Sequence, residues 1–318
     1  MGLCIGTADG IYLAQDGFDS LERTLDATVH RVRRFDDTLF AAASEGLYRS
    51  TNGTEWTRIG RFEGEVCSVV VSPSGNEWYV GTRPAAVYVS TDEGESWTEI
   101  ESFQTVPDRD RWRDRAPGDD AGVRTMAVHR AAPDRLIVGI EPGGVCISVD
   151  GGSTWSERSV GLHDDVHHLL TLGRDEYVAA TGNGLYRSTD SGRTWVRQDT
   201  DYRDHWFTHF RESAEHGSTL YTAATGLGPA EGKGALLEWE ADAAVPHRLP
   251  YPGENDSFVV SWVVDEGRLF AGTMRATGEV ERDEGIEPTA EGRVLRRTQT
   301  GWLEVGRVPA APRSMVGL

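Results

Sequence analysis

The segment LYRSTDSGRTW at residues 185–195 decides the fold, because close copies of it recur along the chain. The related segments are VYVSTDEGESW at 87–97, VCISVDGGSTW at 145–155 and the shorter LYRSTNGTEW at 47–56. Self-similarity of this kind is the sequence signature of a repeat architecture. Three copies keep the pattern Ser-x-Asp-x-Gly-x-Thr/Ser-Trp in full, and its residues are Ser90, Asp92, Gly94, Trp97, Ser148, Asp150, Gly152, Trp155, Ser188, Asp190, Gly192 and Trp195.

The residue types of this pattern favour a hairpin turn. An Asp or Asn side chain bonds backbone amides within the turn, Gly adopts a positive φ, and Trp packs back onto the strand pair. A calcium-binding loop is the alternative, because Asp-x-Gly also occurs in such loops. Each copy lacks the spaced oxygen ligands and the terminal glutamate of a calcium loop, so we interpret the aspartates as structural.

The apolar segments around the repeats predict the whole architecture. Seven segments end in small residues, and a second apolar segment precedes six of them. The C-terminal segment 312–318 supplies the missing strand of the first unit, which makes seven four-stranded units with a period of about 40 residues. The seven segments are LCIGT at 3–7, LFAAA at 39–43, WYVGT at 78–82, LIVGI at 136–140, YVAAT at 177–181, LYTAAT at 220–225 and LFAGT at 269–273.

These units predict a single all-β domain over 1–318, a seven-bladed β-propeller with very little helix. The C-terminal strand joins the N-terminal blade and closes the ring, which removes open sheet edges. Six blades with irregular ends is the alternative count.

The repeats resemble the Asp-box, or BNR repeat, of sialidase-like β-propellers. The segments 43–56 and 181–195 are also similar to blades of photosystem II assembly-factor propellers, within the wider class of WD40 and YVTN repeat-like propellers. The first resemblance implies a possible glycoside hydrolase, and the second implies a propeller that binds other proteins. A propeller scaffold by itself does not determine function.

The composition is strongly acidic, with 51 Asp and Glu against 32 Lys and Arg and a formal net charge of −19. Lys233 is the one lysine. This composition resembles that of proteins from halophilic archaea, whose dense carboxylates keep a protein hydrated when salt screens charge repulsion. A GC-rich genome with an ordinary acidic surface is the alternative. The acidic balance excludes a protein that coats nucleic acid through phosphate contacts.

Other sequence signals restrict the location and the cofactors. No apolar run of about 18 residues predicts a membrane span, and the N-terminus lacks a secretory pattern. Cys4, Cys67 and Cys146 match neither a disulfide framework nor a metal-site spacing. We expect a cytoplasmic, monomeric protein with no cofactor and no membrane partner.

The longest predicted connections all fall on one edge of the blades. They are 104–122 and 199–205, which cross between blades, and 226–234 and 275–292, which join second to third strands. Long insertions in a compact domain are usually functional or disordered, so we expect ligand binding at this edge. Insertions tolerated at any exposed site are the alternative.

Candidate binding residues lie in these connections and where the first strands begin. Arg109, Arg111 and Arg113 can clamp a carboxylate or phosphate, with Trp112 as an exposed stacking platform. The alternative is a solvated loop with internally paired charges. Aligned early positions on the first strands are His30, Cys67, Arg124, His167, Phe207, Val259 and Arg313. Of these, Arg124, His167 and Arg313 form a basic patch, and ordinary channel lining is the alternative.

The function predicted from these features is a non-catalytic module that binds a protein or a small anionic ligand. Further candidate contacts are Tyr202, His205 and Trp206. The histidines cannot chelate one metal as strand neighbours, so no metal site is expected. The alternative is a sialidase-like glycoside hydrolase, whose candidate catalytic residues are Tyr202, Asp204 and Glu141. The Arg-Ile-Pro signature of sialidases is absent, so catalysis stays uncertain.

Overall fold

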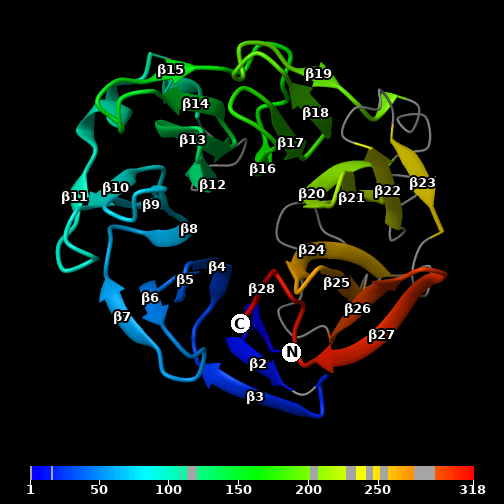
Figure 1. Ribbon diagram of the computed structural model, residues 1–318. Helices are drawn as coiled ribbons and strands as arrows, with labels where there is room; N and C mark the ends of the chain where they lie inside the picture. The colour runs from blue at the N-terminus through cyan, green and yellow to red at the C-terminus, as the bar shows by residue number, and fades with distance from the viewer. Residues whose placement is uncertain are drawn as a thin grey trace. The chain divides into compact units, whose positions relative to one another are not determined.

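The computed structural model describes residues 2–15, 17–107, 109–112, 120–200, 207–226, 234–240, 246–250, 257–275 and 291–318. Within these residues, 28 strands form seven four-stranded antiparallel sheets, drawn in Figure 1. The fold is a seven-bladed β-propeller. The predicted fold class is therefore confirmed, and the count of six blades is wrong.

The blades follow the chain in order. Three sheets precede the middle of the chain and are listed in hydrogen-bonding order. They are β28 (Ser314–Gly317), β1 (Leu3–Gly6), β2 (Ile11–Gln15) and β3 (Ser20–Leu25); β4 (Val29–Phe35), β5 (Thr38–Ala43), β6 (Gly46–Ser50) and β7 (Thr57–Gly60); and β8 (Glu65–Val71), β9 (Trp78–Arg83), β10 (Val87–Ser90) and β11 (Thr98–Glu99).

The other four blades have the same order. They are β12 (Gly122–His129), β13 (Ala132–Glu141), β14 (Gly144–Ser148) and β15 (Ser156–Glu157); β16 (Val166–Thr171), β17 (Tyr177–Thr181), β18 (Gly184–Ser188) and β19 (Val196–Arg197); β20 (Phe207–His216), β21 (Thr219–Gly226), β22 (Gly234–Glu240) and β23 (His247–Leu249); and β24 (Ser257–Asp265), β25 (Arg268–Arg275), β26 (Gly292–Thr298) and β27 (Gly301–Val308).

Helix is confined to one crossover in the described part of the chain. Two 3-10 turns, η1 (Glu101–Thr105) and η2 (Arg109–Arg111), lie between β11 and β12. The low helix content is as predicted, but this connection is not structureless along its whole length. Among the described residues, no helix is long and apolar enough to cross a membrane.

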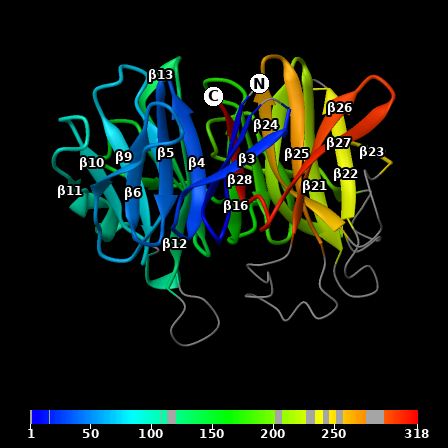
Figure 2. The same ribbon diagram turned by 90° about the horizontal axis from the view of Figure 1, so that it is seen from below.

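The last strand of the chain completes the first sheet. β28 pairs antiparallel with β1, from Leu3 opposite Gly317 to Gly6 opposite Ser314. Figure 1 draws the red C-terminal strand beside the blue N-terminal strands, and Figure 2 shows both chain ends at the same edge of the sheet. The prediction that the C-terminal segment joins the N-terminal blade is confirmed.

By internal contacts the chain divides into two compact units. Unit 1 comprises Met1–Ala41, Arg49–Thr57 and Asp199–Leu318, and unit 2 comprises Ala42–Tyr48 and Arg58–Gln198. A single domain over 1–318 stays a prediction.

Small residues in the second strands let neighbouring sheets pack closely. A Cβ at Gly81 would overlap the side chain of Val123, and one at Gly139 would lie 2.8 Å from Cγ1 of Val166. In unit 2, the resulting core places Ile137 against Tyr177, both almost fully buried. Burial of apolar surface between sheets is the main stabilising contribution, about 25 cal/mol per Å². The small residues of the sequence pattern therefore mark contacts between blades.

The repeated motif forms the same turn between the third and fourth strands of its blades. Oδ1 of Asp190 accepts hydrogen bonds from the Ser188 hydroxyl and the Thr194 amide, at 2.9 Å each. The Ser188 hydroxyl in turn accepts the Gly192 amide at 2.9 Å. Gly192 has φ +76°, a conformation that favours glycine. The aspartate therefore folds its own turn, as the sequence predicts.

The motif tryptophan has a role that the sequence pattern does not predict. We expected it to pack back onto its own strand pair. Instead, its indole N–H reaches the preceding blade: Nε1 of Trp97 donates to the Ile59 carbonyl at 3.1 Å, and Nε1 of Trp195 donates to the Arg158 carbonyl at 2.7 Å. The tryptophan therefore ties neighbouring blades together at their outer strands.

Candidate functional site

The predicted basic patch lies where the first strands of unit 2 begin. The register between first and second strands shifts at Cys67, Arg124 and His167, so each occupies an equivalent extra position. A β-bulge of this kind re-aims a side chain at the end of a sheet. The sequence alignment of these three positions agrees with the structure.

The alignment of the last two blades is wrong by one residue. We predicted Phe207 and Val259 at this position, but the register shifts at Thr208 and Val260. The hydroxyl after the bulge shows the true equivalence in one of them: Ser261 donates to the Pro312 carbonyl at 2.6 Å, as Ser68 donates to the Val123 carbonyl at 2.6 Å. Both strands begin with a residue that counting on the apolar pattern missed.

Glu141 is the centre of a charged cluster in unit 2. It is the last residue of β13, and its Oε2 lies 3.0 Å from Nε of Arg124 and 3.7 Å from Nη2 of Arg83. Its Oε1 lies 3.8 Å from Nε2 of His167. The glutamate therefore divides its two oxygens between two guanidinium groups and an imidazole.

Asp165 extends this cluster on the side of β16. Its Oδ1 lies 3.3 Å from Nε2 of His167, whose side chain is 8% exposed. The Asp165 carbonyl accepts the Gly182 amide at 2.9 Å, and a Cβ at position 182 would overlap Oδ2 of Asp165. The absence of a side chain at Gly182 therefore leaves the space that the Asp165 carboxylate occupies.

Burial keeps the neighbouring thiol protonated. Cys67 is 3% exposed, and burial raises its pKa to about 11, although Arg124 and Arg83 oppose the rise. A thiolate is the nucleophilic form of cysteine, so this residue is not a reactive cysteine at neutral pH.

Sequence reasoning found part of this cluster. It placed Arg124 and His167 together, which the contacts of both with Glu141 bear out, but it assigned Glu141 to a different set of partners. It missed Arg83 and Asp165. A usable signal was present, because Arg83 and Glu141 end equivalent second strands and are each followed by proline.

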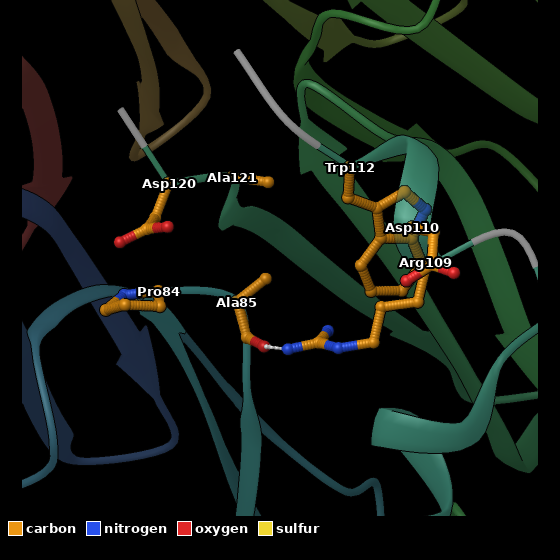
Figure 3. A pocket seen from close by; sticks show the side chains of 7 residues that line it. All are labelled: Pro84, Ala85, Arg109, Asp110, Trp112, Asp120 and Ala121. Carbon is orange, nitrogen blue, oxygen red and sulfur yellow. Dashed lines mark hydrogen bonds between the residues drawn. The ribbon is translucent and has the colours of Figure 1, made fainter. Parts of the chain in front are cut away.

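A pocket of about 210 Å³ lies next to the cluster in unit 2, between the crossover and the β9–β10 loop. Figure 3 shows the Arg109 guanidinium against the Ala85 backbone, where its Nη2 donates to the Ala85 carbonyl at 2.9 Å. Nη1 of Arg109 is buried and has no hydrogen-bond partner among the described residues. The lining residues are Pro84, Ala85, Arg109, Asp110, Trp112, Asp120 and Ala121.

Trp112 lines this pocket but is not the exposed platform that we predicted. Its side chain is 6% exposed and packs on Phe103, with ring centroids 5.1 Å apart. The Arg109 guanidinium lies over the same indole, 5.2 Å from its centroid. The alternating charges of the crossover suggested an exposed loop, but the apolar ring finds a buried site against η1.

Several predicted residues take no part in these contacts or lie outside the described residues. Arg111 is exposed in η2, and Arg313 lies in unit 1 just before β28. The candidates outside the described residues are Arg113, Tyr202, Asp204, His205 and Trp206.

Unit 1 contains a separate buried ion pair. Nη1 of Arg31 lies 2.9 Å from Oε1 of Glu212, and both side chains are less than one-tenth exposed. Oε2 of Glu212 accepts the Trp262 amide at 2.9 Å. These bonds satisfy the carboxylate within the fold, so we interpret this pair as structural.

Comparison with known proteins supports the fold. The family described as the DUF6242 beta propeller domain matches residues 15–139. The sequence match agrees with the structure. A xyloglucanase of Hypocrea jecorina (strain QM6a) is 27% identical over 179 residues, which cover 51% of this chain and 18% of the enzyme.

Solved structures give the same result. The GH74 xyloglucanase from Xanthomonas campestris superposes with a TM-score of 0.62 at 15% identity, over 95% of this chain and 46% of that one. YCF48 from Cyanidioschyzon merolae superposes with a TM-score of 0.59 at 15% identity, over 84% of this chain and 86% of that one. The chain spans less than half the length of either xyloglucanase. At this identity the structural likenesses show the fold alone.

Proposed function

We propose that the chain is a non-catalytic β-propeller binding module, and that the pocket beside Trp112 receives a carboxylate of an acidic peptide or another small anionic ligand. The observation that carries this proposal is the state of Arg109. One of its terminal nitrogens is held by the Ala85 carbonyl, and the other is buried without a partner among the described residues. A ligand carboxylate would satisfy that nitrogen.

The electrostatics of the pocket support an anionic ligand. Burial lowers the pKa of Arg109, with an opposing contribution from Glu99, so the guanidinium has lost part of its hydration. A hydrogen bond to an ionised group contributes about 1.5–3 kcal/mol, more than a neutral one. The guanidinium already stacks on Trp112, which fixes the direction of its free nitrogen.

The other lining residues favour a peptide over a simple anion. The carboxylates of Asp110 and Asp120 are exposed at the same pocket and can accept N–H groups of a ligand. Figure 3 places Asp120 beside Pro84, away from the Arg109 guanidinium. A chain end that carries a carboxylate and neighbouring amides matches both kinds of group.

An immobilised library of acidic peptides with free C-terminal carboxylates tests this proposal, with binding measured in molar potassium chloride. We expect Arg109→Gln to weaken binding at least about tenfold, which corresponds to about 1.4 kcal/mol. Amidation of the peptide C-terminus should cause a similar loss.

Arg130→Gln is the matched control, because Arg130 is exposed in the β12–β13 turn and its loss changes the net charge equally. Binding should be unchanged in this variant. Absence of binding to any library member, or equal losses in both variants, would contradict the proposed pocket.

A glycoside hydrolase is the second candidate, favoured by the similarity to a xyloglucanase over half of the chain. Within the described residues, the nearest oxygens of Glu141 and Asp165 lie within 4.8 Å, close to the carboxylate separation of about 5 Å in retaining glycosidases. Hydrolysis of xyloglucan or fluorogenic glycosides that disappears in Asp165→Asn would favour this candidate over the binding module.

The proposed setting of the protein rests on composition and on the repeats. The turns formed by Ser-x-Asp-x-Gly support an assignment of the repeats as Asp-boxes in a sialidase-like propeller. The net charge of −19 and the single lysine support a protein of a halophilic archaeon that works in the cytoplasm.

A further inference from the structure

Unit 2 brings a buried imidazole nitrogen between two carboxylates. Nε2 of His167 lies 3.3 Å from Oδ1 of Asp165 and 3.8 Å from Oε1 of Glu141. One donor atom from each of the three residues lies within 4.8 Å of the other two. The two carboxylates remain 25% and 33% exposed, so the cluster is open to solvent on their side.

These separations suit a small coordinated cation. Zinc binds imidazole nitrogen and carboxylate oxygen at about 2.0–2.2 Å, which puts neighbouring ligand atoms of a tetrahedron about 3.3 Å apart. The two distances from Nε2 of His167 are near that value, and only the carboxylates need to approach each other. Three protein ligands and one open position are typical of an exchangeable zinc site.

The arginines orient one ligand and influence which cations can bind. Arg124 and Arg83 hold Oε2 of Glu141, which leaves Oε1 directed to His167, as an outer-shell partner does in a metal site. Their positive charges repel any cation. An ion bound mainly by charge, such as Ca²⁺ or Mg²⁺, is therefore disfavoured, whereas Zn²⁺, Ni²⁺ and Co²⁺ gain a strong bond to the imidazole nitrogen.

Gly182 fixes the third ligand. Because a side chain at this position would overlap Oδ2 of Asp165, the carboxylate lies over the glycine with Oδ1 turned to His167. The backbone hydrogen bond from the Gly182 amide to the Asp165 carbonyl holds the two segments together. Both contacts position the ligand without themselves binding a metal.

We propose that Glu141, Asp165 and His167 form a binding site for a single divalent transition-metal ion of the zinc class. Without the ion, the same atoms pair directly as a carboxylate–imidazole–carboxylate triad. The site is distinct from the Arg109 pocket, and it departs from the expectation of no metal. Strand spacing alone considered histidine pairs, whereas the fold joins one histidine to carboxylates from two different turns.

Titration of the metal-free full-length chain with Zn²⁺ by calorimetry, and with Co²⁺ by visible absorption, tests the proposal. We expect one ion per chain and a higher melting temperature with Zn²⁺, because a ligand that binds only the folded state stabilises it. Ca²⁺ and Mg²⁺ should cause no comparable rise. His167→Gln and Asp165→Asn should each weaken Zn²⁺ binding at least about tenfold.

Two further variants separate coordination from loss of fold. Gly182→Ala keeps all three ligands but displaces Asp165, so Zn²⁺ affinity should fall while far-ultraviolet circular dichroism stays unchanged. His129→Gln, which changes a histidine at the other end of β12, should bind Zn²⁺ as the parent does. A parent chain that binds no ion, binding unaffected by His167→Gln, or an equal response to Ca²⁺ would overturn the proposal.

Discussion

Asp190 shows how one residue determines the conformation of a turn. Its Oδ1 accepts the Thr194 amide and its Oδ2 accepts the Thr194 hydroxyl, at 2.9 and 2.7 Å. These bonds to the ionised form, together with the bond from Ser188, lower the pKa of Asp190 to about 2. Asn52 takes the same place in another blade and accepts the Thr54 amide at 2.9 Å. An acceptor oxygen is thus the shared requirement, and the charge adds a dependence on pH.

Asp190→Ala should therefore destabilise the chain in a manner that depends on pH. A lowered folded-state pKa means that the carboxylate stabilises the fold above its unfolded value, 3.8, and that this stabilisation is lost as the pH falls through about 2. We expect the difference in free energy of unfolding between parent and variant to shrink from pH 5 to pH 2. Urea unfolding at each pH measures it.

Asp37→Ala is the matched control for this measurement, because the Asp37 side chain is fully exposed. Its difference from the parent should stay small and constant with pH. A difference for Asp190→Ala that does not change between pH 5 and pH 2 would show that the charge of the aspartate contributes nothing.

At the scale of elements, the blades are joined by repeated contacts between sheets. The motif tryptophan reaches the outer strand of the preceding blade, and small residues of the second strand face the next blade. Trp195 is the most buried of the motif tryptophans, 4% exposed, and its backbone amide also donates to the Val160 carbonyl at 2.9 Å. One residue thus supplies two hydrogen bonds between successive blades.

Trp195→Phe should lower the free energy of unfolding by about 1–2 kcal/mol. The ring is largely kept, but the Arg158 carbonyl loses the donor that lies 2.7 Å away. Trp195→Ala should cost about 3–5 kcal/mol, because it also empties a buried volume. Equilibrium urea unfolding measures both variants.

Trp302→Phe provides the comparison, because the Trp302 indole nitrogen has no hydrogen-bond partner among the described residues. This variant should cost less than Trp195→Phe. Equal losses at the two sites would mean that the indole N–H does not contribute to the link between blades.

At the scale of the whole molecule, the two ends of the chain build one sheet. Met315 is 3% exposed and packs with Leu3 and Ile5 in a core that also contains Phe270. Ser314 donates to the Val32 carbonyl at 3.2 Å, so the C-terminal strand also contacts β4. The last few residues thus belong to the core of unit 1.

Deletion of 312–318 should destabilise the chain severely, because it removes the partner strand of β1 and exposes its edge. Thermal melting followed by circular dichroism measures this. Met315→Ala tests the same contact more mildly, with an expected loss of about 2–5 kcal/mol. Leu318→Ala should change less, since Leu318 is 37% exposed. Unchanged melting after the deletion would contradict the role of β28.

The sequence by itself determines the blades. The Ser-x-Asp-x-Gly-x-Thr/Ser-Trp pattern is local, and its residues form their turn through bonds within about seven positions of each other. The alternation of apolar and small residues likewise predicts the strands and their number. These features need no knowledge of distant contacts, which is why the seven units and the closing strand agree with the structure.

Only the tertiary structure decided which side chains meet. Glu141 and Asp165 come from different blades, and their approach to His167 depends on register shifts and on the empty space at Gly182. Trp112, placed by its charged neighbours on the surface, is buried because Phe103 offers it an apolar face. Local sequence determines how each blade folds, whereas packing between blades determines the chemistry at their edge.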